Sequence, residues 1–141
     1  MGQYYLIVNP DKQQYLEPHN FNDGAKLTEF GSSGDGVMFG LAVLLADGNG
    51  RGGGDVSSSD DEIIGSWSGD RIVVAGDYAD GLKFLSEEQK SNQDILQFIA
   101  DKHYSPGSKK PEHVNLYAYA REQFTDISAR VHKIIEDELL L

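Results

Sequence analysis

Residues 4–16 read Tyr-Tyr-Leu-Ile-Val-Asn-Pro-Asp-Lys-Gln-Gln-Tyr-Leu and decide how the fold begins. The run from Tyr4 to Val8 is aromatic and aliphatic, and most of its residues favour β-strands. Asn9-Pro10-Asp11 is typical of a turn, because proline fixes φ and the Asn and Asp side chains bond nearby backbone groups. Gln14 to Leu16 then has the pattern of a returning strand. The stretch therefore predicts an N-terminal antiparallel hairpin.

Apolar runs in the middle of the chain add a helix and two strands to this hairpin. Residues 37–45, Val-Met-Phe-Gly-Leu-Ala-Val-Leu-Leu, favour a buried helix by their length and composition. Asp35 precedes this run and is placed to cap the first N–H groups of the helix. Residues 62–66 and 71–75 are expected to form strands. The wholly apolar segment 72–75 suits a central strand that is covered on both faces.

The C-terminal half is expected to be helical. Residues 83–104 contain two helix-start patterns and predict one helix or two. Residues 115–125 suit either a helix or a strand, whereas residues 125–140 carry one apolar stripe and predict a helix that Thr125 can cap. We therefore expect a single α+β domain over residues 1–141. It would have an N-terminal antiparallel or mixed β-sheet with a buried helix, and helices packed from the C-terminal half.

The net charge of −11 limits the classes of partner. A chain this acidic repels a phosphate backbone, so we expect no binding to the backbone of DNA or RNA, whereas a basic protein partner would suit it. The absence of cysteine excludes disulfides and thiolate chemistry. No apolar segment reaches membrane-spanning length and the first residues lack a secretory pattern. We therefore expect no membrane association and a cytoplasmic location.

Glycine and aspartate concentrate in one block of the sequence. Residues 31–81 hold thirteen of the sixteen glycines and nine carboxylates, but only two basic residues. Residues 48–61 are expected to form a long, mobile loop. Within it Arg51, Gly52 and Gly53 are candidate ligand-binding residues, because successive backbone N–H groups and a guanidinium can cradle a phosphate. The loop lacks the Gly-Lys-Ser/Thr ending of a P-loop and the ligand pattern of an EF-hand, so neither class applies.

A second group of candidate ligand-binding residues follows this loop. Trp67 is the single tryptophan; it either stacks on a base or sugar of a ligand or belongs to the core, and we favour the core. Asp70 and Arg71 stand between the two expected strands, and Asp77 follows the second one. With Trp67 these three residues complete the candidate pocket.

Three residues are candidate metal ligands. Asp77 and Asp80 follow an apolar strand, a position from which carboxylates can hold a divalent cation, and His19 is a third candidate. The five residues 76–80 are similar to the Gly-Asp motif of metal-dependent phosphatases, but the later Asn and His residues of that motif are missing. The alternative is that the two aspartates cap turns or the following helix.

Two segments carry a resemblance to a known family. The opening Met-Gly-Gln-Tyr-Tyr and residues 65–78, Gly-Ser-Trp-Ser-Gly-Asp-Arg-Ile-Val-Val-Ala-Gly-Asp-Tyr, resemble a family of small uncharacterised bacterial and phage proteins. The resemblance covers roughly residues 1–80, with a weaker similarity at residues 124–128. It implies a bacterial or phage source, and no activity, cofactor or catalytic residue.

Three functions follow from these patterns. The first is a small, acidic, non-enzymatic module that binds a phosphorylated or nucleotide-like ligand through its glycine-rich loops. The second is an acidic protein-interaction module of the inhibitor or immunity type, which covers a basic partner surface. The third and least supported is a metal-dependent hydrolase that uses Asp70, Asp77, Asp80 and His19. Because the sequence contains no complete catalytic set, we favour a binding protein over an enzyme.

Overall fold

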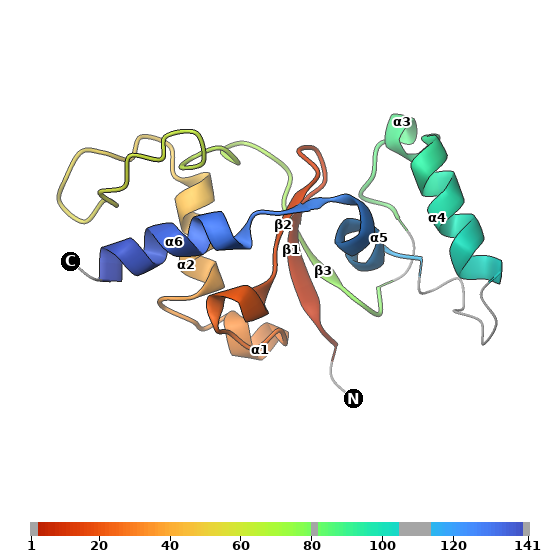
Figure 1. Cartoon of the computed structure of the whole chain (residues 1–141), viewed down its shortest axis with the longest axis horizontal. Helices are drawn as coiled ribbons and strands as arrows, with labels where there is room; N and C mark the ends of the chain where they lie inside the picture. Colours follow the sequence, from red (N-terminus) through yellow and green to blue (C-terminus); the bar gives the residue numbers. More distant parts are fainter. Residues whose placement is uncertain (1–2, 80–81, 105–113, 140–141) are drawn as a thin grey trace.

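A computed structural model describes residues 3–79, 82–104 and 114–139. In these residues a mixed four-stranded sheet lies between two groups of helices (Figure 1), which confirms the α+β class. The strands are β1 (Tyr5–Asn9), β2 (Gln14–Leu16), β3 (Val73–Gly76) and β4 (Thr125–Asp126). The helices are the 3₁₀ turn η1 (Pro18–Phe21), α1 (Leu27–Phe30), α2 (Val37–Leu45), α3 (Glu87–Lys90), α4 (Gln93–Tyr104), α5 (Leu116–Gln123) and α6 (Ser128–Leu139).

The predicted hairpin is confirmed by the pairing of β1 with β2. The two strands are antiparallel, with Ile7 opposite Leu16. The side chain of Asn9 shapes the turn, because its Oδ1 accepts hydrogen bonds from the backbone N–H groups of Asp11 and Lys12 at 3.1 and 2.9 Å. The full strand order is β3-β1-β2-β4, and β4 joins β2 in parallel.

The sheet separates two hydrophobic cores, and β1 contributes to both. Ile7 packs into the core formed with α2 and α6, whereas Leu6 and Val8 pack into the core formed with α4 and α5. The strand covered on both faces is therefore β1. The expectation that residues 72–75 are this central strand is wrong, because β3 is an edge strand and its Val74 is 42% exposed.

Helix α2 has the predicted bounds but not the predicted cap. The first N–H of the helix, that of Val37, donates to Asp23 Oδ2 at 2.7 Å, while Asp35 is exposed. Asp23, fourteen residues before Val37, thus caps the helix in place of Asp35. Gly40 lies at the contact with η1 and α6, where an added Cβ would come within 3.0 Å of Phe21 and Val131.

Residues 62–66 are turns and not a strand, because they cap the end of α2. The backbone N–H groups of Gly65 and Trp67 donate to the carbonyls of Val43 and Leu44, both at 2.9 Å. The last carbonyls of a helix have no partner within it. Residues 65–67 supply these partners. Position 65 requires glycine, because its φ is +76° and a Cβ there would clash with the Ala46 carbonyl oxygen at 2.6 Å.

The C-terminal half is helical, as predicted, and residues 83–104 divide into α3 and α4. The segment 115–125, which suited a helix or a strand, contains the helix α5. Asn115 caps this helix, because its Oδ1 accepts from the Ala118 N–H at 2.9 Å. The predicted cap at Thr125 is wrong, because Thr125 pairs with β2 and Asp126 Oδ1 instead accepts from the Ser128 N–H at 2.9 Å.

Candidate functional site

The glycine-rich loop between α2 and the following turns is closed by its own side chains. Asn49 Oδ1 accepts from the Val56 N–H at 2.9 Å, and Asn49 Nδ2 donates to the Val56 carbonyl at 3.0 Å. Asp55 Oδ2 accepts from the backbone N–H groups of Gly50 and Arg51, at 3.0 and 2.8 Å. Two N–H groups of the loop, including that of the candidate residue Arg51, therefore bind an internal carboxylate.

The predicted loop residues of the pocket are otherwise at the surface. The Arg51 side chain is exposed, and Gly52 and Gly53 are exposed beside it. Both glycines have positive φ, +76° and +53°, and no atom outside the loop lies within 4 Å of where a Cβ would stand. Glycine is thus required there by backbone conformation and not by a close approach to a neighbouring group.

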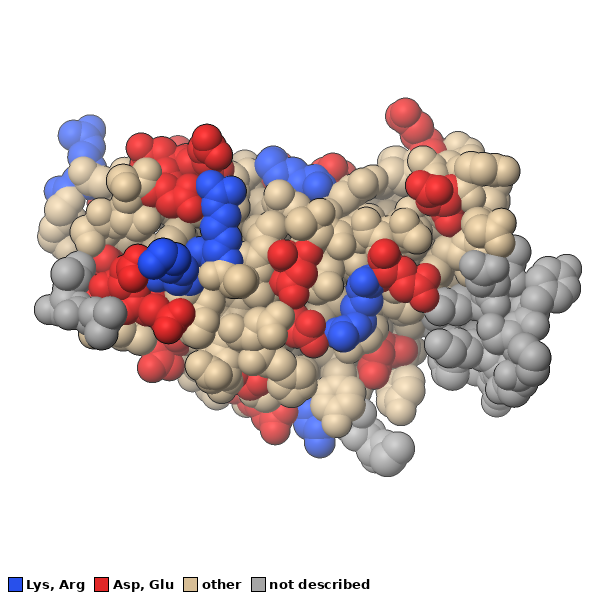
Figure 2. Space-filling model, in the orientation of Figure 1, with Lys and Arg blue, Asp and Glu red and all other residues tan. Residues whose placement is uncertain are grey.

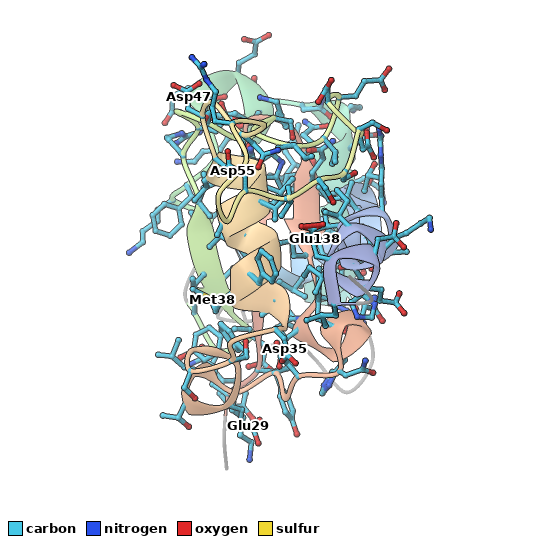
Figure 3. All side chains as sticks on the ribbon, turned by 90° about the vertical axis from the view of Figure 1, so that its left-hand side faces the viewer. Glu29, Asp35, Met38, Asp47, Asp55 and Glu138 are labelled. Carbon is cyan, nitrogen blue, oxygen red and sulfur yellow. The ribbon has the colours of Figure 1, made fainter. Side chains whose placement is uncertain are left out.

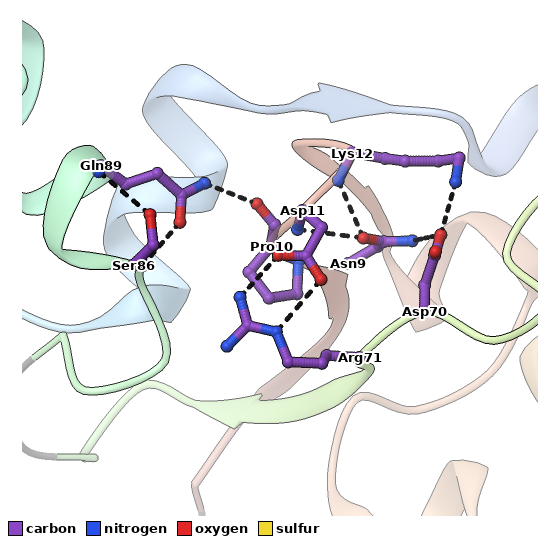
Figure 4. Close-up of polar contacts among 8 residues, drawn as sticks. All are labelled: Asn9, Pro10, Asp11, Lys12, Asp70, Arg71, Ser86 and Gln89. Atoms are coloured by element: carbon purple, nitrogen blue, oxygen red, sulfur yellow. Dashed lines mark hydrogen bonds and ion pairs between the residues drawn. The ribbon is translucent and has the colours of Figure 1, made fainter.

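Asp70 and Arg71 lie beside the β1–β2 turn (Figure 4). Arg71 Nε and Nη2 donate to the two oxygens of Asp11 at 3.1 and 2.6 Å. Asp70 Oδ2 accepts from Lys12 Nζ at 2.6 Å and from Nδ2 of the buried Asn9 at 2.8 Å. These hydrogen bonds hold the pKa of both carboxyl groups below the ordinary value. The cluster is satisfied internally and joins the turn to the segment before β3.

Trp67 is wholly buried, which confirms the core interpretation. Its Nε1 donates to Gln14 Oε1 at 2.7 Å, so the indole connects the turn segment after α2 to β2. A buried ring presents no face on which a base could stack. The structure therefore does not bring Trp67, Arg51 and Arg71 together in one pocket.

The candidate metal ligands are only partly described. Asp77 Oδ1 accepts from the Tyr4 N–H at 3.0 Å, and His19 Nδ1 lies 3.2 Å from the Asp23 carbonyl oxygen. Asp80 lies outside the described residues. Among the residues that are described, no group of three or more His, Asp or Glu side chains is placed to hold a metal ion.

The sequence-based reasoning missed the outer face of α2. This helix contains no polar residue, yet only Val37, Gly40, Val43 and Leu44 are buried. Of the remaining residues, Met38, Phe39 and Leu41 are partly buried against the core, whereas Ala42 and Leu45 are exposed. We refer to these five residues as the α2 face. The sequence did carry a signal for this face, since none of the nine residues of the helix is polar. A helix that is apolar on all sides is normally buried on all sides, so any side left uncovered is a candidate binding surface.

Carboxylates surround the α2 face (Figure 3). Glu29 and Asp35 lie toward one end of α2, Asp47 and Asp55 toward the other, and Glu138 of α6 lies to one side. Asp35 and Asp47 are exposed, and neither has a side-chain partner among the described residues. We refer to these five residues as the acidic rim.

The basic residues of α6 do not neutralise the acidic rim, because they are already paired with other carboxylates. Arg130 donates to both oxygens of Asp60, at 2.8 and 2.6 Å, and this hydrogen bonding lowers the pKa of Asp60. Lys133 lies 3.5 Å from Asp137. Figure 2 shows the result, in which acidic groups lie around the blue side chains over the α6 end of the molecule.

A small pocket opens between α2 and the glycine loop. Its volume is about 160 Å³. Apolar side chains make most of its wall: Phe39, Ala42 and Val43 from α2, Val56 from the loop, and Ile64. Asp55 contributes the one carboxylate in the lining. The α2 face thus combines exposed apolar side chains, a concave site and an acidic rim.

The comparisons with known proteins give no match at a significant level to a protein-family model, a curated protein or a solved structure. In the part of the chain that the structure describes, no helix has the length and apolar character needed to cross a membrane.

Proposed function

We propose that this protein is an acidic protein-interaction module that binds a basic, amphipathic segment of a partner on the α2 face. The observation that carries the proposal is an all-apolar helix whose outer side is only partly covered, with Ala42 and Leu45 exposed, inside a rim of carboxylates. Exposed apolar patches with polar borders are typical of protein-binding surfaces. The rim sets the charge of the partner, because complementary charges favour encounter and exclude acidic competitors.

The size of the pocket favours a side chain over a small molecule. Pockets for drug-sized ligands and cofactors measure roughly 300–1,000 Å³. The pocket beside α2 measures about 160 Å³, which is room for one apolar side chain of a partner. Asp55 in its wall opposes an anionic ligand and favours a partner whose anchoring side chain is followed by a lysine or arginine.

The loop geometry also favours this function over the binding of a phosphorylated ligand. A phosphate would have to displace the Asp55 carboxylate from the Gly50 and Arg51 N–H groups. Arg71, the second cation expected in a phosphate pocket, is held by Asp11 on the hairpin turn. The protein-interaction function needs no such rearrangement.

Binding to synthetic helices tests the proposal. We expect a fluorescent amphipathic helix of lysine and leucine to bind, more weakly as salt is raised, and its glutamate–leucine counterpart not to bind. Leu45→Asp places a charge in the α2 face at a side chain that is 38% exposed. It should weaken binding roughly ten-fold or more, because burial of such a side chain is worth about 1.5–3 kcal/mol. Leu96→Asp is the matched control, since Leu96 is 49% exposed on α4 in the other helix layer.

Arg51→Ala separates the two binding functions. Removal of this exposed cation should leave the affinity for the basic helix unchanged or improve it. In a phosphate site the same change should weaken nucleotide binding roughly ten- to hundred-fold. Equal binding of the two helices, or an equal loss in Leu45→Asp and Leu96→Asp, would contradict the proposal.

A further inference from the structure

The free edge of β3 has unpaired backbone groups. The Asp77 N–H donates to the Tyr4 carbonyl at 2.9 Å, in register with the β1–β3 ladder. In an antiparallel pair, residues whose backbone groups bond to the neighbouring strand alternate with residues whose N–H and C=O groups point away from it. Val74 and Gly76 therefore turn their N–H groups away from β1; Val74 is exposed, whereas Gly76 is buried. Among the described residues neither N–H has a partner, nor does the Val74 carbonyl, whereas the Gly76 carbonyl accepts from Ala79.

A groove of about 240 Å³ runs beside this edge. The four residues of β3 form one wall, and Ala79, Phe84 and Leu116 form much of the other. Val74 and Phe84 are 42% and 38% exposed, so apolar surface borders the unpaired strand. The groove has the size and lining to receive an apolar side chain of an added strand.

Lys83 places a positive charge in the lining of this groove. Its Nζ lies 5.0 Å from the centroid of the Phe84 ring, and no carboxylate partner is found for it among the described side chains, those of residues 3–79, 82–98 and 114–139. Four other cations are closely paired, since Lys12, Arg71, Arg121 and Arg130 each contact a carboxylate within 3.0 Å, whereas Lys83, like Arg51, has no such contact among the described side chains. An ammonium beside an apolar groove and a free strand edge is complementary to a peptide carboxylate.

We infer that the β3 edge binds an extended peptide segment in which an apolar residue lies next to a carboxylate. The segment adds to the sheet beside β3 and exchanges main-chain hydrogen bonds with Val74. Its apolar side chain enters the groove and its carboxylate contacts Lys83. Strand addition of this kind takes affinity from the backbone and specificity from the side-chain pocket. A second copy of the chain is a poorer occupant, because two molecules of charge −11 repel each other.

The test uses two peptides of alternating threonine and valine, one ending in glutamate and the other in lysine. Both are acetylated at the N-terminus and amidated at the C-terminus. The glutamate peptide should shift the NMR signals of the Val74 and Gly76 amides and slow their hydrogen exchange. Lys83→Gln should weaken its binding roughly ten- to hundred-fold, as expected for loss of a charge-assisted hydrogen bond. Lys90→Gln is the matched control, because Lys90 lies on α3 outside the groove.

A backbone variant tests the strand addition independently of charge. Val74→Pro removes the outward N–H at an edge position, where proline is tolerated, and should abolish binding with little change in the melting temperature. The inference is overturned if the lysine peptide binds equally well, if Lys83→Gln binds normally, or if the shifts fall away from β3. Concentration-dependent dimerisation that protects the same amides without peptide would also overturn it, in favour of a second copy.

Discussion

The carboxylate of Asp55 accepts a hydrogen bond of 2.8 Å from the backbone N–H of Arg51. Four residues separate donor and acceptor, so the loop curls around its own anion. A glycine-rich stretch with an arginine has the composition of a phosphate cradle, and here the cradle is filled from within. Because these N–H groups are already paired, the apolar helix beside the loop is a better candidate for the binding surface.

Limited proteolysis measures the strength of this closure. Arg51 is the one trypsin site between Lys26 and Arg71. Asp55→Ala removes two charge-assisted hydrogen bonds from the loop, so cleavage after Arg51 should be roughly ten-fold faster. Asp61→Ala is the control, since Asp61 is exposed and its side chain has no described partner. If the wild-type protein is cut as fast as Asp55→Ala, the loop is mobile, as its composition predicts.

The buried indole of Trp67 should be central to stability. Trp67→Ala is expected to destabilise the protein by about 3–5 kcal/mol through loss of burial and formation of a cavity. Trp67→Phe keeps most of the volume but leaves Gln14 without its donor, and should cost about 1–3 kcal/mol. Urea unfolding followed by circular dichroism measures both. A loss below about 1 kcal/mol in Trp67→Ala would contradict the placement of Trp67 in the core.

Ser128 makes a buried hydrogen bond that joins α6 to the end of β2. Its Oγ accepts from the Glu17 N–H at 2.8 Å, and Ser128 is fully buried. Ser128→Ala leaves that N–H without a partner and should lower the free energy of unfolding by about 1–3 kcal/mol. Ser32→Ala, at an exposed serine, should change it by less than about 0.5 kcal/mol. Equal effects of the two changes in urea unfolding would show that the Ser128 bond adds nothing.

The pH dependence of stability follows from carboxylates paired in the folded state. Arg71 holds the pKa of Asp11 below the ordinary 3.8, Arg130 does so for Asp60, and Lys12 and Asn9 do so for Asp70. A folded-state pKa below the unfolded value stabilises the protein above the unfolded pKa, and this contribution is lost as pH falls through the folded value.

The melting temperature should therefore fall as pH drops below about 4. Asp70→Asn should make this fall less steep, because the variant has no Asp70 carboxylate to protonate. Asp61→Asn is the control, and its profile should follow that of the wild type. A melting temperature that stays constant from about pH 5 to about pH 2 would contradict the role of these pairs.

Elements specified by neighbouring residues could be predicted from sequence. The turn at residues 9–11, the helix at 37–45 and the helix start at Ser86 all agree with the structure. At the turn and at Ser86 the decisive interactions span a few residues, such as the bond from the Gln89 N–H to Ser86 Oγ at 3.1 Å. The helix at 37–45 was indicated by its apolar length and composition. The candidate site residues were chosen by composition, and composition does not indicate which donors and acceptors are already paired.

The sequence by itself determined the α+β class, the hairpin, the bounds of the helix at residues 37–45 and the acidic charge, because propensity, turn chemistry and charge act over short distances or over the whole chain. Only the tertiary structure decided that Asp23 caps α2, that β3 is an edge strand and that one side of α2 remains exposed. These features depend on which segments compete to cover the same surface. An apolar helix and an apolar strand look alike in sequence whether or not the chain has another element to cover them.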